Sequence, residues 1–324
     1  MRAVRVHELV GPRGLRVDDV ESPRPGEGEV QISVHAAGVN FPDVLLSHGR
    51  YQFKPEPPFI PGGEAAGVVS AVGPGVSGLK PGDRVVVTMV NGCFAEQLVA
   101  PEAAAVKLPA EVDFTVGAIT LLTYATTYHA LVDRAAIQPG ETLLVLGAAG
   151  GVGVAAIQLG KHLGAKVVAA ASTPEKVAFC KRMGADEGIA YGSEDLKERV
   201  KSLTGGDGAD VVYDPVGGPY SEAALRAIAW KGRFLVVGFA AGDIPKVPLN
   251  LVLLKGCQVV GVFWGAFAMR ETAKNRANCE QVLRWVAGGK LKPHLDATLP
   301  FARAAEALER LERREVQGKI ALVP

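Results

Sequence analysis

The pattern of apolar and polar residues changes partway along the chain. From Met1 to about Leu122, short β-branched runs alternate with segments rich in glycine and proline, namely EVQISVHAAGV, GVVSAVG, DRVVVTM and EQLVA. Such runs, separated by turn residues, are typical of a small, mostly β domain. From Thr142 onwards, longer apolar runs alternate with amphipathic segments: TLLVLGA, KVVAAAS, EGIAY, DVVYDPV, RFLVVGF and QVVGVFW. Continuous apolar strands of this kind predict a doubly wound parallel sheet, covered by helices on both faces.

The C-terminal region predicts a return to the first domain. The segment around Glu271 to Val286 has the pattern of a last helix, and PFARAAEALERLERREVQGKIALV then predicts one more helix and a closing strand. A length of 324 residues favours about two domains. We therefore expect a mostly β domain over 1–122, completed by 293–324, and an α/β domain over 123–292.

Composition and charge narrow the class of protein. The chain is 48% hydrophobic and 21% charged, with 35 Lys and Arg residues against 34 Asp and Glu residues. This near-neutral balance predicts neither nucleic acid nor a membrane surface as the main partner. No signal peptide and no spanning segment of roughly 18 to 20 apolar residues is expected. A reducing cytoplasm is predicted, because the cysteines are widely spaced and form no CxxC pair: Cys93, Cys180, Cys257 and Cys279.

The strongest local signal is a glycine-rich turn between a strand and a helix. In TLLVLGAAGGVGVAAIQLGKHLGAKVVAAAS, a buried strand runs through AAGGVG into a helix and then a second strand. Gly150 allows the backbone to approach a pyrophosphate, and Gly153 allows the helix to pack closely on the strand. Ala148 stands where a first glycine is expected. The segment predicts a dinucleotide site at the helix N-terminus, with backbone contacts from Ala149, Gly150, Gly151, Val152 and Gly153.

The end of the second strand favours NADPH over NADH. An NAD-dependent enzyme usually places Asp or Glu there to bind the ribose diol. Here the strand ends in Ser172 and Thr173, followed by Lys176. A hydroxyl and a cation suit a 2′-phosphate. From this position alone, Lys176 is equally well explained as a solvated charge in the first turn of a helix.

Nearly the whole chain resembles the zinc-independent quinone oxidoreductases, the zeta-crystallin-like branch of the medium-chain dehydrogenase/reductase superfamily. The resemblance depends on the segments AAGVNFPDVLLSHGRY, PGGEAAGVVSAVGPGVSGLKPGDRV, GCFAEQLVAP, AAGGVG, DVVYDPVGG and EVQGKIALVP. It implies a GroES-like catalytic domain, a Rossmann domain that binds NADPH, an active cleft between them, and a homodimer. The strand in QVVGVFW is the expected edge for pairing across a two-fold axis.

The resemblance also implies a 2′-phosphate clamp and the absence of zinc. The positions that match the clamp are Lys176, Tyr191 and Arg314. The positions of the catalytic zinc ligands hold Asn40, Gly63 and Leu122 instead, and the structural-zinc loop retains only Cys93. Zinc needs about three or four protein ligands, so no zinc site is expected. Glu64 lies beside one of these positions and is expected to be structural.

Three residues are implied to line the active cleft in the first domain: Asn40, Asp43 and Tyr51. Asn40 can orient an amide or an acceptor oxygen, and Tyr51 can donate a proton. Asn and Asp around Pro42 also suit a turn, and Tyr51 also suits a loop anchor. From the second domain, the resemblance implies contacts with the nicotinamide half, although burial in the core explains several of these side chains equally well: Thr126, Tyr128, Val237, Gly238, Phe239, Val262, Phe263 and Trp264.

The predicted activity is hydride transfer from NADPH to a quinone or a reactive enone. Such acceptors already place electron density on oxygen, so hydrogen bonds or solvent can complete protonation without a Lewis acid. A 2-enoyl-thioester reductase is an alternative, because that relative shares the zinc-free architecture and a tyrosine that matches Tyr51. A nucleotide-binding protein with a structural or RNA-binding role is an alternative of another class, and the near-neutral charge disfavours it.

Overall fold

Antiparallel strands dominate the first of two units in the computed structural model, which describes residues 1–324. Unit 1 comprises Met1–Leu122, Thr272–Gly289 and Pro293–Pro324. Its main sheet has seven strands in the order β14-β15-β3-β4-β5-β7, with β6 paired to β3. These strands are β3 (Glu29–Gly38), β4 (Glu64–Val72), β5 (Arg84–Thr88), β6 (Gln97–Pro101), β7 (Ala105–Lys107), β14 (Leu295–Pro300) and β15 (Lys319–Val323). A separate hairpin pairs β1 (Arg2–Val6) with β2 (Leu15–Asp19).

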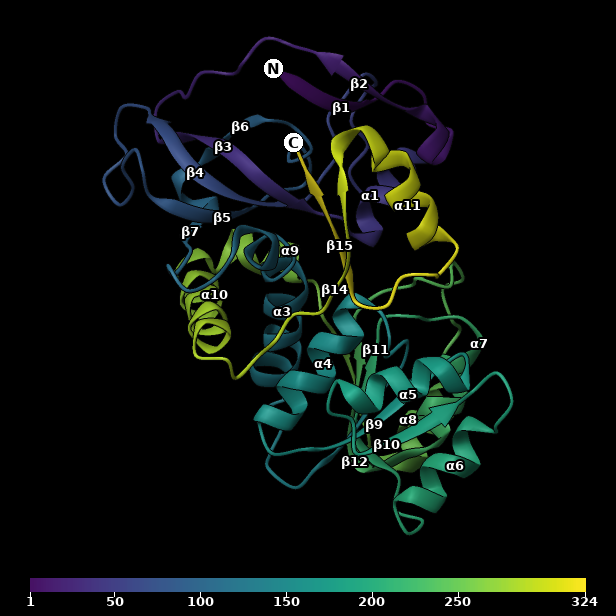
Figure 1. The fold of residues 1–324 in the computed structure, drawn as a ribbon. Coiled ribbons are helices and arrows are strands. Elements are labelled where there is room, and N and C mark those ends of the chain that lie inside the picture. The colour runs from purple at the N-terminus through teal and green to yellow at the C-terminus, as the bar shows by residue number, and fades with distance from the viewer. The chain divides into compact units, whose positions relative to one another are not determined.

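Short helices connect and cover these strands. They are η1 (Gly11–Gly14), α1 (Phe41–Ser47), η2 (Glu102–Ala104), α2 (Phe114–Gly117), α10 (Thr272–Ala287), η4 (Phe301–Arg303) and α11 (Ala304–Glu312). Alternation of apolar residues along the strands buries one continuous core that includes Ile32, Val34, Val85 and Val87. The apolar face of α11 joins this core through Leu308. Figure 1 shows α11 beside α1, which it contacts.

A six-stranded parallel sheet forms unit 2, which comprises Thr123–Glu271 and Lys290–Lys292. The strands are β8 (Thr142–Val145), β9 (Lys166–Ala171), β10 (Glu187–Ala190), β11 (Ala209–Asp214), β12 (Ile228–Val236) and β13 (Gln258–Gly261). Their order, β10-β9-β8-β11-β12-β13, reverses direction next to β8. This is the order of a Rossmann dinucleotide-binding fold, and such folds bind ligands where the strand order reverses. The predicted doubly wound parallel sheet with a mostly β unit is therefore confirmed.

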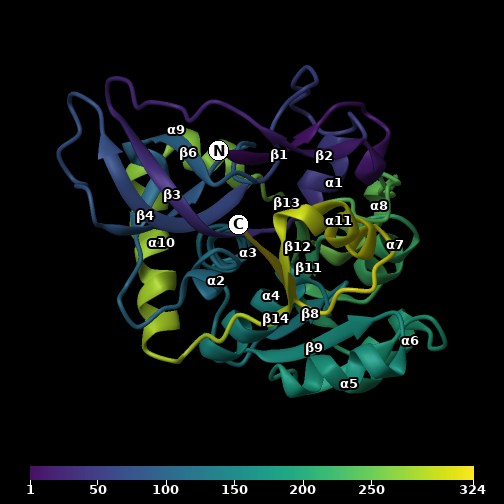
Figure 2. The same ribbon diagram turned by 45° about the horizontal axis from the view of Figure 1, so that its top comes forward.

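Helices follow most of the parallel strands. They are α3 (Leu121–Tyr128), a π-helical segment η3 (His129–Arg134), α4 (Gly151–His162), α5 (Pro174–Arg182), α6 (Leu196–Leu203), α7 (Pro219–Arg226), α8 (Leu249–Lys255) and α9 (Trp264–Arg270). Helix α5 packs on β9 and β10, and both views show it beside β9 (Figure 1; Figure 2). Helices α6, α7 and α8 contact one another in sequence. No helix of the chain is both long and apolar enough to span a bilayer.

One helix differs from the expected division of the chain. We expect residues 123–292 to form the α/β domain, but α10 groups with unit 1. The guanidinium group of Arg276 in α10 donates hydrogen bonds to the carbonyl oxygens of Glu102 and Ala105 at 3.1 and 3.3 Å. These contacts join α10 to η2 and β7. The amphipathic pattern of the helix predicts that it buries one face, but it does not identify the sheet that covers that face.

Candidate active site

Three glycines of the turn after β8 have different structural roles: Gly147, Gly150 and Gly153. Gly147 adopts a left-handed φ of +58° and makes the tight turn, so Ala148 needs no special conformation. A Cβ atom at Gly153 would lie 2.5 Å from the carbonyl oxygen of Gly147 and 2.6 Å from the backbone of Ala148. Only glycine therefore lets α4 approach the turn this closely. A Cβ atom at Gly150 would meet nothing closer than 3.5 Å.

Gly150 is thus not required by packing within the chain. It is the N-cap of α4, with a φ of −79° that any residue adopts. Since neither packing nor backbone conformation requires glycine here, the missing side chain leaves space in front of the helix N-terminus. There the first amide groups point outward and the helix dipole is positive. The cofactor fits this position: residues 149–153 are able to hold a pyrophosphate through backbone N–H groups.

The carboxyl ends of β9 and β10 bring together three of the predicted cofactor residues. Ser172 directly follows β9, and the N–H of Tyr191 donates to the carbonyl oxygen of Ala171 at 3.0 Å. The Thr173 hydroxyl caps α5 by accepting from the N–H of Lys176 at 3.3 Å. Lys176, half-buried, is therefore in the first turn of α5, near the end of β9. No carboxylate follows β9 in the three residues 172–174.

An aromatic contact holds the predicted Tyr191. The ring of Tyr220 in α7 lies 4.2 Å from the ring of Tyr191, centroid to centroid, at an interplanar angle of 41°. Tilted aromatic pairs at this distance are favourable and restrict ring rotation. The sequence pattern did not single out Tyr220, because a tyrosine after Gly-Gly-Pro carries no motif of its own.

The other predicted residues of unit 2 lie at strand ends and on α3. The N–H groups of Val237 and Gly238 donate to the carbonyl oxygen of Asp214 at 2.9 and 3.3 Å, which fixes the backbone after β12. Val262 is buried, and its N–H donates to Val236. Phe263 is 60% exposed and Trp264 only 9%, so Trp264 belongs to the interior of unit 2. Thr126 and Tyr128 are half-buried, whereas Phe239 is exposed.

In unit 1, Asn40 and Asp43 form the start of α1. Asn40 is the N-cap, and its backbone N–H donates to Oδ2 of Asp43 at 2.8 Å. Oδ1 of Asp43 accepts from the N–H of Gly62 at 3.2 Å. Burial raises the pKa of Asp43 to about 6, against the lowering effect of these hydrogen bonds and of Lys319. The carboxylate of Asp43 thus ties α1 to the loop before β4 and holds Asn40 through its backbone.

The side chain of Asn40 is held by Lys319, which the sequence pattern did not single out. Nζ of Lys319 donates to Oδ1 of Asn40 and to the carbonyl oxygen of Val39, the latter at 2.7 Å. It also lies 3.9 Å from Oε2 of Glu64, an oxygen with no hydrogen-bond partner. Burial raises the pKa of Glu64 to about 7, while the Lys319 charge opposes that rise. A lysine within the apolar ending KIALV was the available signal.

This cluster is a poor site for zinc. The positions expected to hold metal ligands are occupied by an amide, a glycine and a leucine: Asn40, Gly63 and Leu122. A Cβ atom at Gly63 would lie 3.2 Å from Cδ1 of Leu122, so an apolar side chain fills the space beside it. A buried ammonium group already supplies a positive charge to Glu64. No group of three or more His, Cys, Asp or Glu side chains in the structure is arranged to hold a metal ion.

Tyr51 and Arg314 are the remaining predicted residues of unit 1. Tyr51 is half-buried beside a small cluster of Val6, Leu46 and Phe59. Burial, and secondarily the negative charge of Asp43, raises the pKa of Tyr51, so the phenol keeps its proton at neutral pH. Arg314 follows α11 with a left-handed φ of +60°. Such a conformation is unfavourable for a residue with a Cβ atom.

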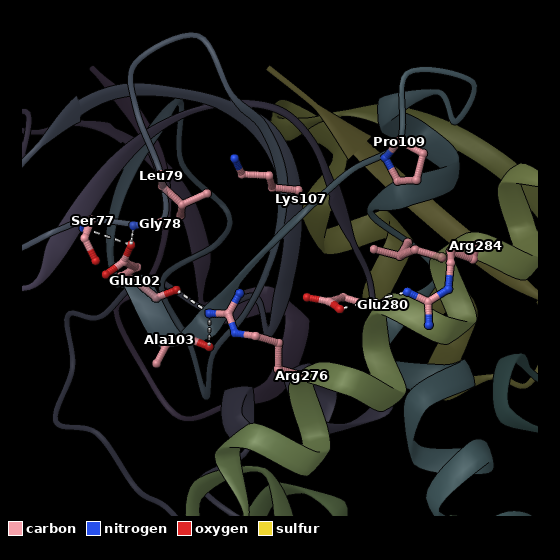
Figure 3. A pocket seen from close by; sticks show the side chains of 11 residues that line it. Ser77, Gly78, Leu79, Glu102, Ala103, Lys107, Pro109, Arg276, Glu280 and Arg284 are labelled. Atoms are coloured by element: carbon pink, nitrogen blue, oxygen red, sulfur yellow. Dashed lines mark hydrogen bonds and ion pairs between the residues drawn. The ribbon is translucent and has the colours of Figure 1, made fainter.

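A cavity of about 620 Å³ in unit 1 contains none of the predicted residues. Figure 3 shows its polar side chains bonded within the protein: Arg276 points to the carbonyl oxygens of Glu102 and Ala103, and the carboxylate of Glu102 accepts from Ser77 and Gly78. These groups hold α10 and a surface loop in place. The cavity is therefore not the candidate site.

A Rossmann-type sheet with a glycine-rich turn, joined to a mostly β unit, defines the class of dinucleotide-dependent oxidoreductases. Residues 26–110 match the family model for the alcohol dehydrogenase GroES-like domain, and residues 151–287 match that for the zinc-binding dehydrogenases. The chain belongs to the medium-chain dehydrogenase/reductase superfamily, among its quinone oxidoreductase-like members.

Particular relatives support this membership along the whole chain. A quinone oxidoreductase-like protein 2 homolog of Nematostella vectensis is 39% identical, over 99% of this chain and 88% of its own length. Quinone oxidoreductase 1 of Escherichia coli is 34% identical, over 99% of both chains. The crystal structure of Escherichia coli quinone oxidoreductase complexed with NADPH superposes with a TM-score of 0.94 at 32% identity, and covers 100% of both chains.

Proposed function

We propose that this protein transfers a hydride from NADPH to a quinone or a reactive enone, without a zinc ion. The observation that carries the proposal is the cluster around Asn40: amide, glycine and leucine stand at the metal positions, and Lys319 provides the positive charge beside Glu64. The names of the relatives, quinone oxidoreductases, support the acceptor class. Quinones and enones suit such a site because they accept a hydride without prior activation by a metal.

NADPH supplies the hydride when it is bound, and the residues of this chain bind and orient it. The N-terminus of α4 provides amide donors for the pyrophosphate, and Gly150 leaves room for it. We assign the 2′-phosphate to Lys176, Tyr191 and Arg314, the three positions that match the clamp in the sequence. Ser172 stands where a carboxylate would repel this phosphate. The Tyr220 ring restricts the position of the Tyr191 phenol.

On the acceptor side, we assign direct contact to Asn40 and Tyr51. The phenol of Tyr51 keeps its proton at neutral pH and is a suitable donor for an oxygen that gains negative charge during reduction. Asp43 acts through the backbone of Asn40, because both of its oxygens are bonded to backbone N–H groups. It therefore positions a residue of the site rather than reacting itself.

The test is oxidation of NADPH and NADH by metal-free protein, measured in parallel with 1,4-benzoquinone, 9,10-phenanthrenequinone and crotonyl-CoA. We expect turnover of the quinones with NADPH, at a rate that a chelator leaves unchanged. Turnover of crotonyl-CoA alone would assign the protein to enoyl-thioester reduction instead. A rate that falls with chelator and recovers with added zinc would refute the metal-free reaction.

We further propose a homodimer formed through β13. This strand is at the end of the sheet order, so one of its edges is unpaired within the chain. Large exposed apolar side chains lie on β13, on the neighbouring β12 and α8, and just after β13: Trp230, Leu249, Leu253, Leu254, Val259 and Phe263. An unpaired edge with an apolar surround fits a second copy that continues the sheet.

Light scattering tests the dimer. The wild-type protein should have twice the 33.9 kDa mass of the chain, and Val259→Lys should lower the mass toward that of the monomer. Val90→Lys is the matched control, because Val90 is similarly exposed in unit 1. A monomeric wild-type protein at micromolar concentration would refute the dimer. We also propose a cytoplasmic location, because all four cysteines are free thiols, and cell fractionation tests it.

A further inference from the structure

Lys319 is an unusual residue for its position in the fold. It begins β15, whose other residues are apolar, and only 5% of its surface is exposed. The antiparallel register of β15 with β3 pairs Ala321 with Gly38, which directs the start of β15 toward the loop after β3. Nζ of Lys319 therefore reaches Val39 and Asn40 at the N-terminus of α1. Lysine is rarely buried in this way unless its ammonium group is paired.

Stability alone does not require this ammonium group. The carboxyl group nearest to it, that of Glu64, is fully buried at 3.9 Å, and Oε2 of Glu64 has no hydrogen bond. Removing two charges from water costs more than such a long contact returns. A neutral pair of similar volume at the same two positions is often as stable as a buried ion pair, or more stable.

The ammonium group does contribute to one property that an apolar side chain would not, which is the orientation of the Asn40 carboxamide. Oδ1 of Asn40 accepts from Lys319, and Nδ2 donates to the carbonyl oxygen of Gly38 at 3.1 Å. Rotating the carboxamide by half a turn would put its NH₂ group against an ammonium group and its oxygen against a carbonyl oxygen. Both contacts would then be repulsive, so only one orientation is favourable.

We propose that Lys319 is a positioning residue of the reaction, which fixes the orientation of the Asn40 carboxamide toward the acceptor. The inference rests on the proposed function, in which Asn40 contacts the acceptor. Lys319 itself does not touch the acceptor, since the residue is buried and two of its three N–H donors are directed to Val39 and Asn40. The same ammonium group places a positive charge beside Glu64, at a position where the chain has no metal ligands.

The experiment replaces Lys319 and Glu64 with a neutral pair, which distinguishes a role in orienting Asn40 from a role in balancing the charge of Glu64. Lys319→Met alone leaves Glu64 buried without a cation and should lower the unfolding temperature. Lys319→Met combined with Glu64→Gln removes both charges, keeps similar volumes and should restore stability. If Lys319 orients Asn40, the double variant stays about 10- to 100-fold lower in kcat for quinone, while its Kd for NADPH is unchanged. Adding Asn40→Ala to the double variant should then cause little further loss.

A matched control uses the ion pair between the exposed Lys107 and the half-buried Asp83, whose charged atoms lie 3.1 Å apart in the same unit. Lys107→Met with Asp83→Asn removes the same charges and should leave kcat unchanged. Recovery of wild-type kcat in the stable variant with Lys319→Met and Glu64→Gln would show that Lys319 only balances the charge of Glu64. That result would overturn the proposal.

A second readout does not depend on activity. It therefore distinguishes failure of the positioning role from failure of the proposed function. If the wild-type protein turns over no acceptor, the proposed function fails, and the ¹⁵N side-chain signal of Asn40 still tests the inference. This signal is assigned as the one lost in Asn40→Ala. It should broaden or shift in the Lys319→Met, Glu64→Gln variant, because only the contact of Nδ2 with Gly38 then orients the carboxamide, and it should stay sharp in the control. A sharp, unmoved signal in both variants would refute the positioning role.

Discussion

Two alanine substitutions in the glycine-rich turn should have opposite effects. At Gly153, a Cβ atom would lie 2.5 to 2.6 Å from the backbone of Gly147 and Ala148, and no side chain is able to move aside. Gly153→Ala should therefore cost at least about 1 to 3 kcal/mol of stability. At Gly150 the nearest atom would be 3.5 Å away, and φ is −79°.

The stability of Gly150→Ala should stay within about 0.5 kcal/mol of the wild-type value. Alanine lowers the entropy of the unfolded chain, which stabilises by about 0.4 to 1 kcal/mol. Alanine is also a weaker N-cap than glycine, which offsets much of that gain. The added methyl group would nevertheless stand where the pyrophosphate approaches. We expect Gly150→Ala to raise the Kd for NADPH at least tenfold, equivalent to about 1.4 kcal/mol.

Thermal unfolding without cofactor and calorimetric titration with NADPH measure the two effects separately. At about 2 to 4 °C per kcal/mol for a unit of this size, the loss in Gly153→Ala should be readily measurable. Gly153→Ala with wild-type stability would refute the close-packing argument. Gly150→Ala with wild-type affinity for NADPH would show that the cofactor does not approach the N-terminus of α4 as proposed.

Three further predictions concern the phosphate clamp, backbone strain and pH. Lys176→Ala and Tyr191→Ala should each weaken NADPH binding by about 1.5 to 3 kcal/mol and scarcely affect NADH, and equal losses for both cofactors would remove the phosphate clamp. Arg314→Gly should raise the unfolding free energy by about 0.5 to 1 kcal/mol, because glycine adopts the φ of +60° without strain. The same variant should weaken the binding of NADPH but not that of NADH. Lower stability in thermal unfolding would contradict the strain argument. Burial raises the pKa of Glu64 to about 7 and that of Asp43 to about 6, whereas both ionise near pH 4 when unfolded, so the folded state binds more protons between these values. The contribution of these two carboxyl groups to stability should therefore decrease as pH rises from 5 to 8, and the stability of Glu64→Gln relative to wild type should rise over the same range; parallel pH curves from denaturant titration would refute this linkage.

The sequence by itself determined the fold class and the position of the glycine-rich turn. Both are local properties: six apolar runs alternating with amphipathic segments require a covered parallel sheet, and AAGGVG between a strand and a helix requires a close backbone turn. The absence of zinc ligands at Asn40, Gly63 and Leu122 is likewise a statement about residue types. The roles of these residues in hydride transfer remain predictions.

Only the tertiary structure decided which distant residues meet. Lys319 reaches Asn40, 279 positions earlier in the chain, because β15 pairs with β3, and strand pairing depends on the packing of the whole unit. For the same reason α10 groups with unit 1, and the ring of Tyr220 contacts that of Tyr191. The task of Gly147 also emerged only from the backbone, since the motif directs attention to Ala148 while φ is positive one residue earlier. Local patterns specify elements, but contacts between remote segments depend on register and burial, which no short stretch of sequence contains.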